Sequence, residues 1–360
     1  MIIDSPTELV FPDLFYRLSG FAAGQDVFLK LEGFNVTGSI KLKTAIGLIE
    51  DLERRGIAVP KETVIVESSS GNLGIALSLV CASKGYRFIC VTDLNANRAN
   101  LRGMELYGAE VIVIDKPDPV SGYLGARLKT VDRILKTEPH AVWLNQYGNI
   151  ANKTVHANKT GAEIAREFDR VDWMFVGSGT TGTIAGVSER LRAEFPGIRI
   201  IAVEPEGSVT FGGKPGRRNI PGIGTSVRPK LADLVAPDEI ITINEKSTVE
   251  ACRAFVRDYH LLVGGSTGSV LAAIKQKAGE FAPGDTVVAI SPDLGEKYLD
   301  TIYDPAWVNA HVLAVSAGEA ARAGPQLDIA AIASRPPYSA IAGAPGGQHA
   351  DKIERLYPRT

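Results

Sequence analysis

The stretch WMFVGSGTTGTIAGVSERLRAEF, residues 173–195, decides the fold class of this chain. It begins with the apolar run WMFV, passes through the glycine-rich loop GSGTTG (residues 177–182) and continues as an amphipathic stretch. That order predicts a buried strand, a tight loop and a helix, which is the repeating unit of α/β proteins. A second apolar run, RIIAVE, follows and ends at Glu204.

Short apolar and β-branched runs alternate with amphipathic stretches along most of the chain. Further predicted strands are VFLKL (27–31), TVIVE (63–67), RFICVT (87–92), EVIVI (110–114), EIITI (239–243) and TVVAI (286–290). Several runs are apolar on both faces, which is typical of strands in a mostly parallel sheet with helices on each side. Ligands bind at the carboxyl ends of such strands. We therefore expect the Gly/Ser/Thr-rich loops that follow three of these strands to share one site.

The composition is that of an ordinary globular protein, with 360 residues, 39 Lys+Arg, 41 Asp+Glu and 45% hydrophobic residues. This length predicts two domains, and the balanced charge argues against nucleic-acid binding. Cys81, Cys90 and Cys252 lie in apolar runs and are expected to be buried thiols rather than metal ligands. The N-terminus lacks the pattern of a signal peptide, and no long apolar run occurs. We expect a cytoplasmic protein with small-molecule partners, no bound metal and no membrane contact.

The chain changes character at two places. A Pro/Asp/Gly loop in the stretch 111–133 marks a soft boundary region, and the domain junction is expected near residue 150. Between residues 311 and 350, 24 of 40 residues are Ala, Gly, Ser or Pro. The remaining residues include too few bulky apolar side chains to form a core. The segment 311–360 is therefore expected to be a peripheral extension, a linker or partly disordered.

The loop GSGTTG has the spacing of a dinucleotide-binding fingerprint, with Glu204 at the end of the next strand. A glycine loop that leads into a helix offers backbone N–H groups to a phosphate. The hydroxyls of Ser178, Thr180, Thr181 and Thr183 suit a terminal phosphate monoester better than a bridging pyrophosphate. Taken alone, the loop is compatible with a nucleotide, another phosphate-bearing cofactor or a plain tight turn.

Three further segments point to a cofactor with several anchoring points. Lys41 in GSIKLK begins a predicted helix, and a helix N-terminus disfavours its ammonium form, as an imine-forming lysine requires. ESSSGNLG (67–74) and GGSTGS (264–269) are strand–loop–helix corners rich in N–H and hydroxyl donors. Each alone has an ordinary alternative, a surface lysine or a capped turn. Together they match a pyridoxal phosphate enzyme acting on an amino acid, with a phosphate cradle, a carboxylate cradle and an imine-forming lysine.

Seven motifs in order carry a family resemblance that covers roughly residues 5–308. They are KLEGFNVTGSIKLK, ESSSGNLGIAL, NQYGNIANKTVHANKTGAEI, GSGTTGT, PGIGTS, GGSTGS and SPDLGEKYL. The order resembles the fold type II pyridoxal phosphate enzymes, the cysteine synthase and cystathionine β-synthase family. The resemblance implies a tryptophan synthase β-like α/β fold, a homodimer and two domains with open, mostly parallel twisted sheets. The implied boundaries are 1–44 plus 150–310 for the large domain, 45–149 for the small domain and 311–360 for the extension.

The resemblance also implies roles for individual residues. Lys41 would form the Schiff base, Asn72 would contact the ring hydroxyl and Ser266 would face the ring nitrogen. The cofactor phosphate would bind to Gly177, Gly179, Thr180, Thr181, Gly182 and Thr183. The substrate carboxylate would bind to Ser69, Ser70, Gly71 and Leu73, where the last replaces a family threonine. Gln146 would border the path of the nucleophile, and Gly222 in PGIGTS would lie beside the substrate.

A narrower likeness, through EGSVTFGGKPGRRNIPGIGTS and PDLGEKYLDTIY, is to the branch that serves staphyloferrin B synthesis. This branch makes N-(2-amino-2-carboxyethyl)-L-glutamate from O-phospho-L-serine and L-glutamate through an aminoacrylate, as a source of 2,3-diaminopropionate for siderophores and antibiotics. A neutral hydroxyl such as Ser266 cannot keep the ring nitrogen protonated, which favours β-replacement over transamination. Arg127 and Tyr147 are candidates for reading anionic substrates. One of Lys214, Arg217 and Arg218 is the candidate for receiving the leaving phosphate, and Arg217 is the first choice.

Three alternatives remain open at this point. A cysteine or S-sulfocysteine synthase that uses O-phosphoserine or O-acetylserine would share every cofactor contact and differ in its nucleophile. An NAD-dependent dehydrogenase would rest on GSGTTG and Glu204. A catalytically silent relative is disfavoured because Lys41 and Asn72 are both present.

Overall fold

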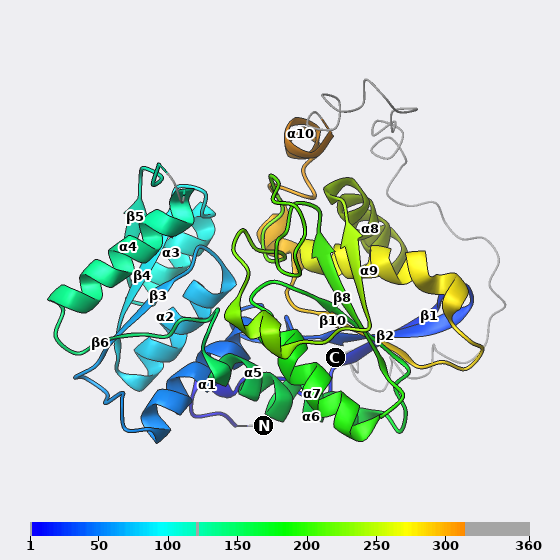
Figure 1. Ribbon diagram of the computed structural model, residues 1–360, viewed down its shortest axis with the longest axis horizontal. Coiled ribbons are helices and arrows are strands. Elements are labelled where there is room, and N and C mark those ends of the chain that lie inside the picture. Colours follow the sequence, from blue (N-terminus) through cyan, green and yellow to red (C-terminus); the bar gives the residue numbers. More distant parts are fainter. Residues whose placement is uncertain (1, 120–121, 314–360) are drawn as a thin grey trace, which may run out of the picture. The chain divides into compact units, whose positions relative to one another are not determined.

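The computed structural model describes residues 2–119 and 122–313, which form two sheets, each with helices on both faces (Figure 1). The prediction for the segment 311–360 therefore falls almost entirely outside the described residues. The α/β fold with mostly parallel sheets is confirmed.

The larger sheet has six strands in the order β1-β2-β10-β7-β8-β9. All neighbouring pairs are parallel except β1 and β2, which form an antiparallel hairpin at one edge. The strands are β1 (Phe15–Ala22), β2 (Gln25–Leu31), β7 (Trp173–Gly177), β8 (Arg199–Pro205), β9 (Glu239–Ile243) and β10 (Val287–Ser291). β1 is absent from the sequence prediction.

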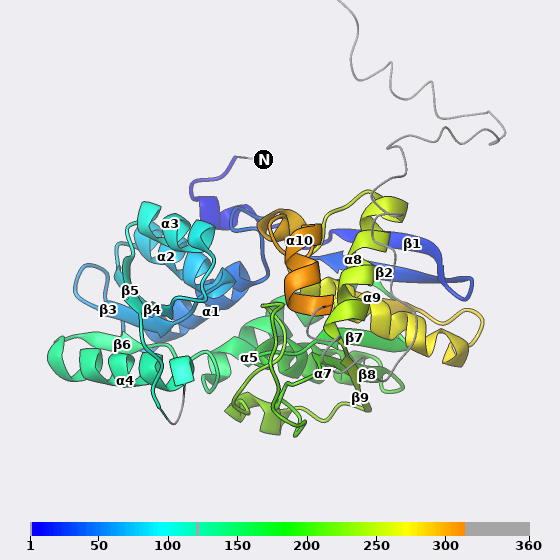
Figure 2. The same cartoon turned by 90° about the horizontal axis from the view of Figure 1, so that it is seen from above.

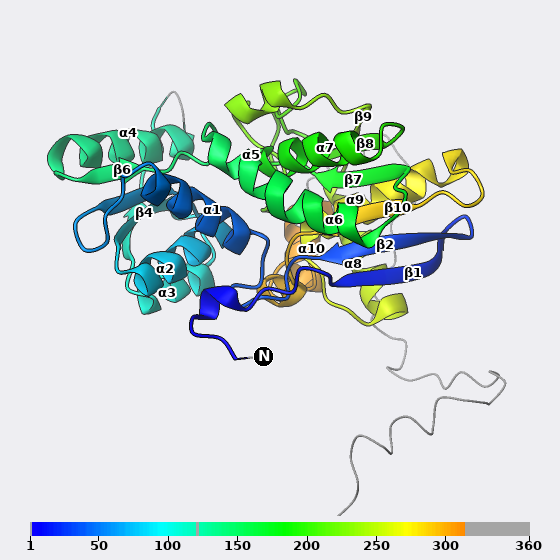
Figure 3. The same ribbon diagram turned by 90° about the horizontal axis from the view of Figure 1, so that it is seen from below.

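Helices on both faces bury this sheet, which explains why its strands are apolar on both sides (Figures 2 and 3). Phe175 packs into the core that includes residues of α8 (Glu245–Tyr259) and α9 (Gly265–Lys277). The neighbouring Met174 and Val176 pack into the opposite core with α6 and α7. The helices on that second face are α5 (Ile150–His156), α6 (Ala162–Glu167) and α7 (Gly182–Glu194), and a turn of π-helix (Ala157–Gly161) joins α5 to α6.

The smaller sheet has four parallel strands in the order β5-β4-β3-β6. They are β3 (Val64–Ser68), β4 (Arg87–Asp93), β5 (Glu110–Ile114) and β6 (Ala141–Trp143), and β6 is absent from the sequence prediction. One face packs on α1 (Lys41–Arg54), α2 (Asn72–Lys84) and α3 (Arg98–Leu106). The other face packs on α4 (Gly122–Thr137). The two-domain boundaries stay a prediction, and the proposed boundary at residue 44 falls inside α1.

Shorter elements complete the described chain. They are 3-10 turns at Pro6–Glu8, Lys230–Leu234, Ala278–Glu280 and Gly295–Tyr298, the helix α10 (Pro305–Val308) and the π-helical turn Asn309–Leu313. Cys81, Cys90 and Cys252 are free and buried, as their apolar surroundings predict. None of the helices within residues 2–119 and 122–313 is both long and apolar enough to cross a membrane. In the same residues, no cluster of three His, Cys, Asp or Glu side chains could hold a metal ion.

Candidate active site

Lys41 is the first residue of α1, and the segment before it is held by the segment that follows β10. Ile40 N donates to Pro292 O over 2.7 Å, and Ser39 pairs with Asp293 in an antiparallel bridge. Within the described chain the Lys41 Nζ has no hydrogen bond or ion pair. Burial lowers the pKa of Lys41 to about 8, against the opposing effect of the Asp293 charge. Roughly a tenth of this lysine is therefore a neutral, nucleophilic amine at pH 7, far more than for an ordinary lysine.

The corner between β3 and α2, which is the predicted anion nest, is held in shape by one serine hydroxyl. Ser69 Oγ accepts hydrogen bonds from Gly71 N (3.4 Å) and Gly74 N (3.1 Å), which fixes the start of α2. A Cβ at Gly71 would meet no atom within 4 Å, so this backbone is open to a ligand. Leu73 packs its side chain into the core beneath α1 and α2, so only its backbone N–H remains available for substrate binding.

Asn72 has two charged partners that sequence analysis did not identify. Its Nδ2 donates to Asp293 Oδ2 over 2.8 Å, and Lys297 Nζ donates to its Oδ1 over 2.7 Å. Both partners lie in the motif SPDLGEKYL, to whose residues the family resemblance assigns no role. These contacts join the N-terminus of α2 to the carboxyl end of β10.

The loop between β7 and α7 has the form of a phosphate cradle. Thr181 adopts a left-handed conformation (φ 64°), and no side chain caps α7, so the first N–H groups of this helix are left for a ligand. A Cβ at Gly182 would lie 2.4 Å from the Asn152 amide, so only glycine fits there. That amide donates from Nδ2 to Thr180 Oγ1 (3.3 Å) and to Gln146 O (2.8 Å).

Two of the four hydroxyls predicted to bind phosphate point elsewhere. Ser178 Oγ donates to Val176 O, and Thr181 Oγ1 donates to Thr180 O. The difference arises because a tight loop has unpaired carbonyl oxygens of its own, and short hydroxyl side chains bond to these first. Thr180 and Thr183 keep hydroxyls that can face a ligand, and the backbone N–H groups contribute the rest.

Ser266 lies in the first turn of α9, beside the glycine loop. Ser266 is buried, and its hydroxyl has no hydrogen-bond partner among the described residues. A Cβ at Gly177 would lie 3.8 Å from Ser266 Cβ, so the corner of α9 and the start of the phosphate cradle are neighbours. The unpaired hydroxyl suits contact with a ring nitrogen.

These observations meet the requirements of pyridoxal phosphate. The chain offers a buried amine of lowered pKa, an unpaired hydroxyl, a fixed amide and an uncapped helix N-terminus beside loop glycines. Asp293 connects three of these parts, because it bonds to Asn72, pairs with Ser39 and accepts from Gly264 N (3.2 Å) two residues before Ser266. The residues present therefore fit the cofactor.

A second cluster of polar groups lies where β3 and β6 end. The buried Glu67 accepts from Gln146 N (3.1 Å) and Trp143 Nε1 (3.2 Å), and burial raises its pKa to about 7. Gln146 Nε2 donates to Ser68 O (3.3 Å), so the predicted nucleophile-path residue touches the substrate loop. Glu67 opens the motif ESSSGN, but nothing in that motif indicates that its carboxylate is buried.

The charges of two arginines act on Tyr147. Burial raises the pKa of its hydroxyl, and the charges of Arg127 and Arg218 lower it. Arg218 NH1 is buried without a hydrogen-bond partner, whereas the buried Arg127 Nε forms an ion pair with Asp93 Oδ2 at 3.4 Å. Arg217, the predicted choice, is instead exposed and donates to Asn219 Oδ1. Arg127 also reaches Ser70 Oγ at 3.5 Å, which links this cluster to the anion nest.

The loop between β8 and the 3-10 turn at residues 230–234 covers these groups. Gly224 N donates to Ser178 O over 2.7 Å, and Leu231 N donates to Tyr147 O over 3.3 Å. Gly222, predicted to lie beside the substrate, has its carbonyl oxygen 3.9 Å from where a Cβ at Gly179 would be. The loop thus lies against the phosphate cradle, and the 3-10 turn that follows it lies against Tyr147.

Two buried groups support the cradle from behind. His156 Nε2 is 3.0 Å from Thr44 Oγ1 and 3.3 Å from Thr183 Oγ1, so it connects α1 to α7. Burial, followed by the charges of Lys41 and Lys43, holds the pKa of His156 well below its usual range. The imidazole is therefore neutral, and it acts on the site through the two threonines.

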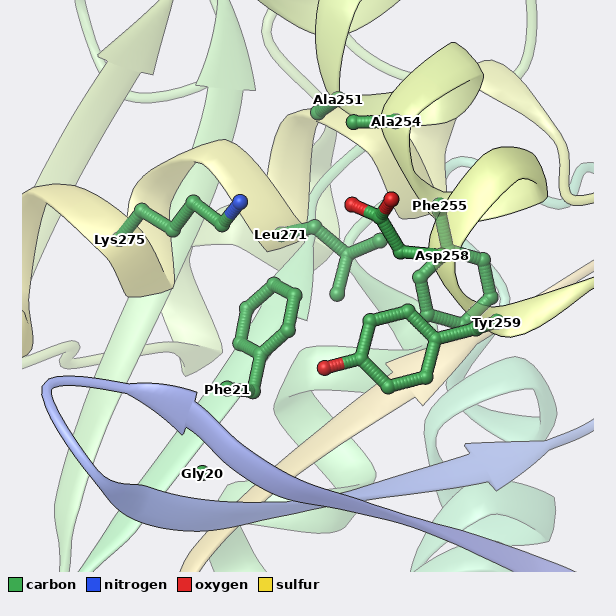
Figure 4. Close-up of a pocket in the computed structure, with 9 residues that line it drawn as sticks. All are labelled: Gly20, Phe21, Ala251, Ala254, Phe255, Asp258, Tyr259, Leu271 and Lys275. Atoms are coloured by element: carbon green, nitrogen blue, oxygen red, sulfur yellow. The ribbon is translucent and has the colours of Figure 1, made fainter. Parts of the chain in front are cut away.

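A small pocket of about 130 Å³ lies away from all these residues, between the β1 hairpin, α8 and α9 (Figure 4). Phe21, Phe255 and Tyr259 line it, with Asp258 and Lys275 at its rim. None of the candidate active-site loops contributes to it, so we assign it no part in the chemistry.

Residues 6–293 match the family of pyridoxal-phosphate dependent enzymes. The chain belongs to this family, its cofactor is pyridoxal phosphate, and it is a biosynthetic enzyme of the cysteine synthase type that catalyses β-replacement. This overturns the NAD-dependent dehydrogenase alternative. Glu204, which that alternative needed, is buried at the end of β8.

Individual relatives are similar over most of their length. The chain is 40% identical over 308 residues to an N-(2-amino-2-carboxyethyl)-L-glutamate synthase from Ralstonia nicotianae, which covers 84% of this chain and 90% of the relative. An O-acetylserine dependent cystathionine β-synthase from Helicobacter pylori is similar in structure, with a TM-score of 0.77 and 29% sequence identity. The match covers 84% of this chain and 100% of the synthase chain. An O-ureido-L-serine synthase is also similar, with a TM-score of 0.77 and 27% sequence identity, and the match covers 93% of this chain and 100% of that synthase chain.

Proposed function

We propose that this enzyme replaces the phosphate of O-phospho-L-serine with the amine of L-glutamate and so forms N-(2-amino-2-carboxyethyl)-L-glutamate. The observation that carries the proposal is the buried NH1 group of Arg218, which has no hydrogen-bond partner, beside a second buried arginine, Arg127, whose Nε lies 3.4 Å from Asp93 Oδ2. The charges of both arginines act on Tyr147. A buried donor without a partner is unfavourable unless a ligand satisfies it. The relative from Ralstonia nicotianae, whose name states this product, supports the proposal.

The charges of the substrates explain why two arginines are needed. L-Glutamate brings a second carboxylate, and O-phospho-L-serine brings a phosphate that must leave as an anion. Arginine binds both groups with paired N–H donors. Sulfide is small and needs no such partner, so an enzyme that used it would leave the NH1 donor of Arg218 unsatisfied. O-Acetylserine would likewise release a leaving group with less charge.

We assign the remaining roles as follows. The cofactor withdraws electrons from the substrate Cα, which allows its proton and then the β-substituent to depart. Lys41 holds the cofactor and, once released, removes the Cα proton with its Nζ. The N–H groups and hydroxyls of the nest at residues 69–73 bind the substrate carboxylate. Gln146 and Tyr147 border the space for the incoming amine.

Product identification tests the proposal directly. The holoenzyme is incubated with O-phospho-L-serine or O-acetyl-L-serine, and each donor is combined with L-glutamate, sulfide or thiosulfate. We expect the glutamate adduct by mass spectrometry only with glutamate, and faster with the phosphorylated donor. Faster formation of cysteine or S-sulfocysteine would overturn the proposal in favour of the alternative synthases.

Substitution of the arginines tests the observation itself. Arg218→Met removes the half-buried guanidinium, and Arg217→Met is the matched control on its exposed neighbour. Loss of a charge-assisted hydrogen bond of roughly 1.5–3 kcal/mol predicts a KM for one anionic substrate that is raised roughly 10- to 100-fold. The control is expected to change KM less than about twofold. Equal effects of both variants would argue against a specific anion site at Arg218.

We also propose that the enzyme is a cytoplasmic homodimer that supplies 2,3-diaminopropionate for a siderophore or peptide antibiotic. The family resemblance supports the dimer, and three free, buried thiols support a reducing compartment. Light scattering of the purified holoenzyme tests the dimer, and a monomeric mass at micromolar concentration would contradict it.

A further inference from the structure

We propose that Lys297 and Asp293 fix the side-chain amide of Asn72 so that it can present only a hydrogen-bond donor to the ring oxygen of the cofactor. The inference rests on the proposed assignment of Asn72 to that ring. It makes Lys297 and Asp293 positioning residues that act through Asn72.

The argument begins with what each partner can do. The Lys297 ammonium can only donate, and it donates to Asn72 Oδ1 (2.7 Å) and to Thr37 O (2.8 Å). Asp293 Oδ2 accepts from Asn72 Nδ2 (2.8 Å). A flipped amide would face the ammonium with its NH2 group and the carboxylate with its oxygen. Both contacts would be repulsive, so only one amide orientation is favourable.

Asp293 is itself held in place. Tyr298 OH donates to the same Oδ2 over 2.5 Å, and a Cβ at Gly264 would lie 2.0 Å from Oδ1. The carboxyl is therefore enclosed by a glycine on one side and a donated hydroxyl on the other. Because Oδ2 accepts two hydrogen bonds and Oδ1 has no partner, a proton that binds to Asp293 would go to Oδ1. The amide orientation of Asn72 then holds in either protonation state of Asp293.

The second amide hydrogen is the one that a ligand can take. Nδ2 carries two hydrogens, of which one goes to Asp293 and the other faces the hydroxyl of Tyr298. The Tyr298 hydroxyl is neutral, so a negatively charged ring oxygen would be the stronger acceptor for that hydrogen. A fixed donor stabilises a negatively charged oxygen relative to a hydroxyl. The ring oxygen of the cofactor is thus kept deprotonated, which is the form that gives the bound cofactor its yellow absorption band. The same segment pairs with Ser39, so the fixed amide and the Lys41 backbone share one support.

The test uses the absorption spectrum of the resting holoenzyme, without turnover, across a pH series. Lys297→Met removes the donor that orients the amide, and Lys297→Arg restores one. We expect Lys297→Met to shift intensity from the yellow band to the near-ultraviolet band and to weaken binding of pyridoxal phosphate to the apoprotein, measured by fluorescence quenching. Lys297→Arg should recover most of both properties. Glu296→Gln, on the exposed neighbouring residue, is the control and should leave the spectrum unchanged.

A further pair of variants separates this inference from the site assignment. Asn72→Ala removes the amide, and an unchanged spectrum would overturn the assignment of Asn72 to the ring and the inference with it. A changed spectrum for Asn72→Ala with an unchanged spectrum for Lys297→Met would overturn the inference alone. Asp293→Ala provides a second route if Lys297→Met does not fold, and it should shift the bands in the same direction.

Discussion

The backbone N–H of Gln146 donates to Glu67 Oε2 over 3.1 Å and so joins the carboxyl ends of β6 and β3. The second carboxylate oxygen accepts from Ser68 N (2.6 Å) and Trp143 Nε1 (3.2 Å). Gln146 Nε2 donates in return to Ser68 O. One buried carboxylate therefore holds together the loop assigned to the substrate carboxylate and the loop assigned to the nucleophile.

Glu67→Ala is expected to destabilise the fold and weaken substrate binding together. The change leaves three buried N–H groups without an acceptor, each worth roughly 1–3 kcal/mol. Chemical denaturation measures the free energy of unfolding, and steady-state kinetics measures KM. Glu62→Ala, on an exposed residue before the same strand, is the control and should change neither. A raised KM with unchanged stability would show that Glu67 does not support the loops in this way.

The contribution of Glu67 to stability is expected to fall as pH rises. Burial raises its folded pKa to about 7, above the usual value of 4.5, so the folded state holds a proton that the unfolded state releases in this range. The stabilising contribution of the protonated Glu67 is fully present below pH 4.5 and is lost progressively up to about pH 7. Denaturation of the wild type and Glu67→Gln across this range measures the effect. A difference between the two proteins that is independent of pH would contradict the raised pKa.

The lowered pKa of Lys41 predicts how the apoprotein takes up its cofactor. Only the neutral amine attacks the aldehyde, so the rate of yellow colour formation should rise with pH and level off above about 8. Stopped-flow absorbance with pyridoxal phosphate measures the rate, and N-α-acetyl-lysine is the control with an ordinary amine. Lys41→Ala should give no covalent yellow species. A rate that levels off only at the pH of the control would mean that the amine is fully solvated.

Gly182→Ala is expected to weaken cofactor binding. The added Cβ would lie 2.4 Å from the Asn152 side chain, which bonds to Thr180 and Gln146 and cannot retreat without losing those contacts. Overpacking of this kind costs about 1–3 kcal/mol, so the Kd for pyridoxal phosphate should rise roughly 10-fold or more. Gly103→Ala, in α3 with no atom near its Cβ position, is the control and should leave Kd unchanged. Equal Kd values for the two variants would mean that the cradle tolerates the extra carbon.

Glu163→Gln is expected to destabilise the protein through a buried cluster of charges. Glu163 lies 2.9 Å from Lys30 Nζ and also pairs with Lys43, which in turn lies 2.9 Å from Glu32 Oε1. Removal of one buried charge leaves an uncompensated lysine, at a cost of roughly 3–5 kcal/mol. Denaturation with Glu167→Gln, on the exposed end of the same helix, as the control measures the loss. Equal stability of both variants would show that solvent reaches the cluster.

Of the ten strands that residues 2–119 and 122–313 form, eight follow from the apolar runs of the sequence, and the two missed strands lack that pattern. β6 has only three residues, too few for any period. β1 carries Ser19 and Gly20 in its middle and lies at the sheet edge, where its pairing with β2 becomes irregular. Edge strands need less buried apolar surface than central ones, so their sequences are less distinctive.

The sequence by itself determined the class of enzyme and the loops that hold the cofactor. Strand, glycine loop and helix follow one another within about 20 residues at Lys41, Asn72 and Gly182, and such local order can be recognised from spacing alone. At Ser266 the prediction of a preceding strand is wrong, because the helix α8 comes before that loop. Only the tertiary structure decided which charged side chains support those loops. Asp293 meets Asn72 from 221 residues away, and Arg218 rather than Arg217 is turned inward. Neither fact follows from spacing, because burial and the direction of a side chain depend on how distant segments pack against each other.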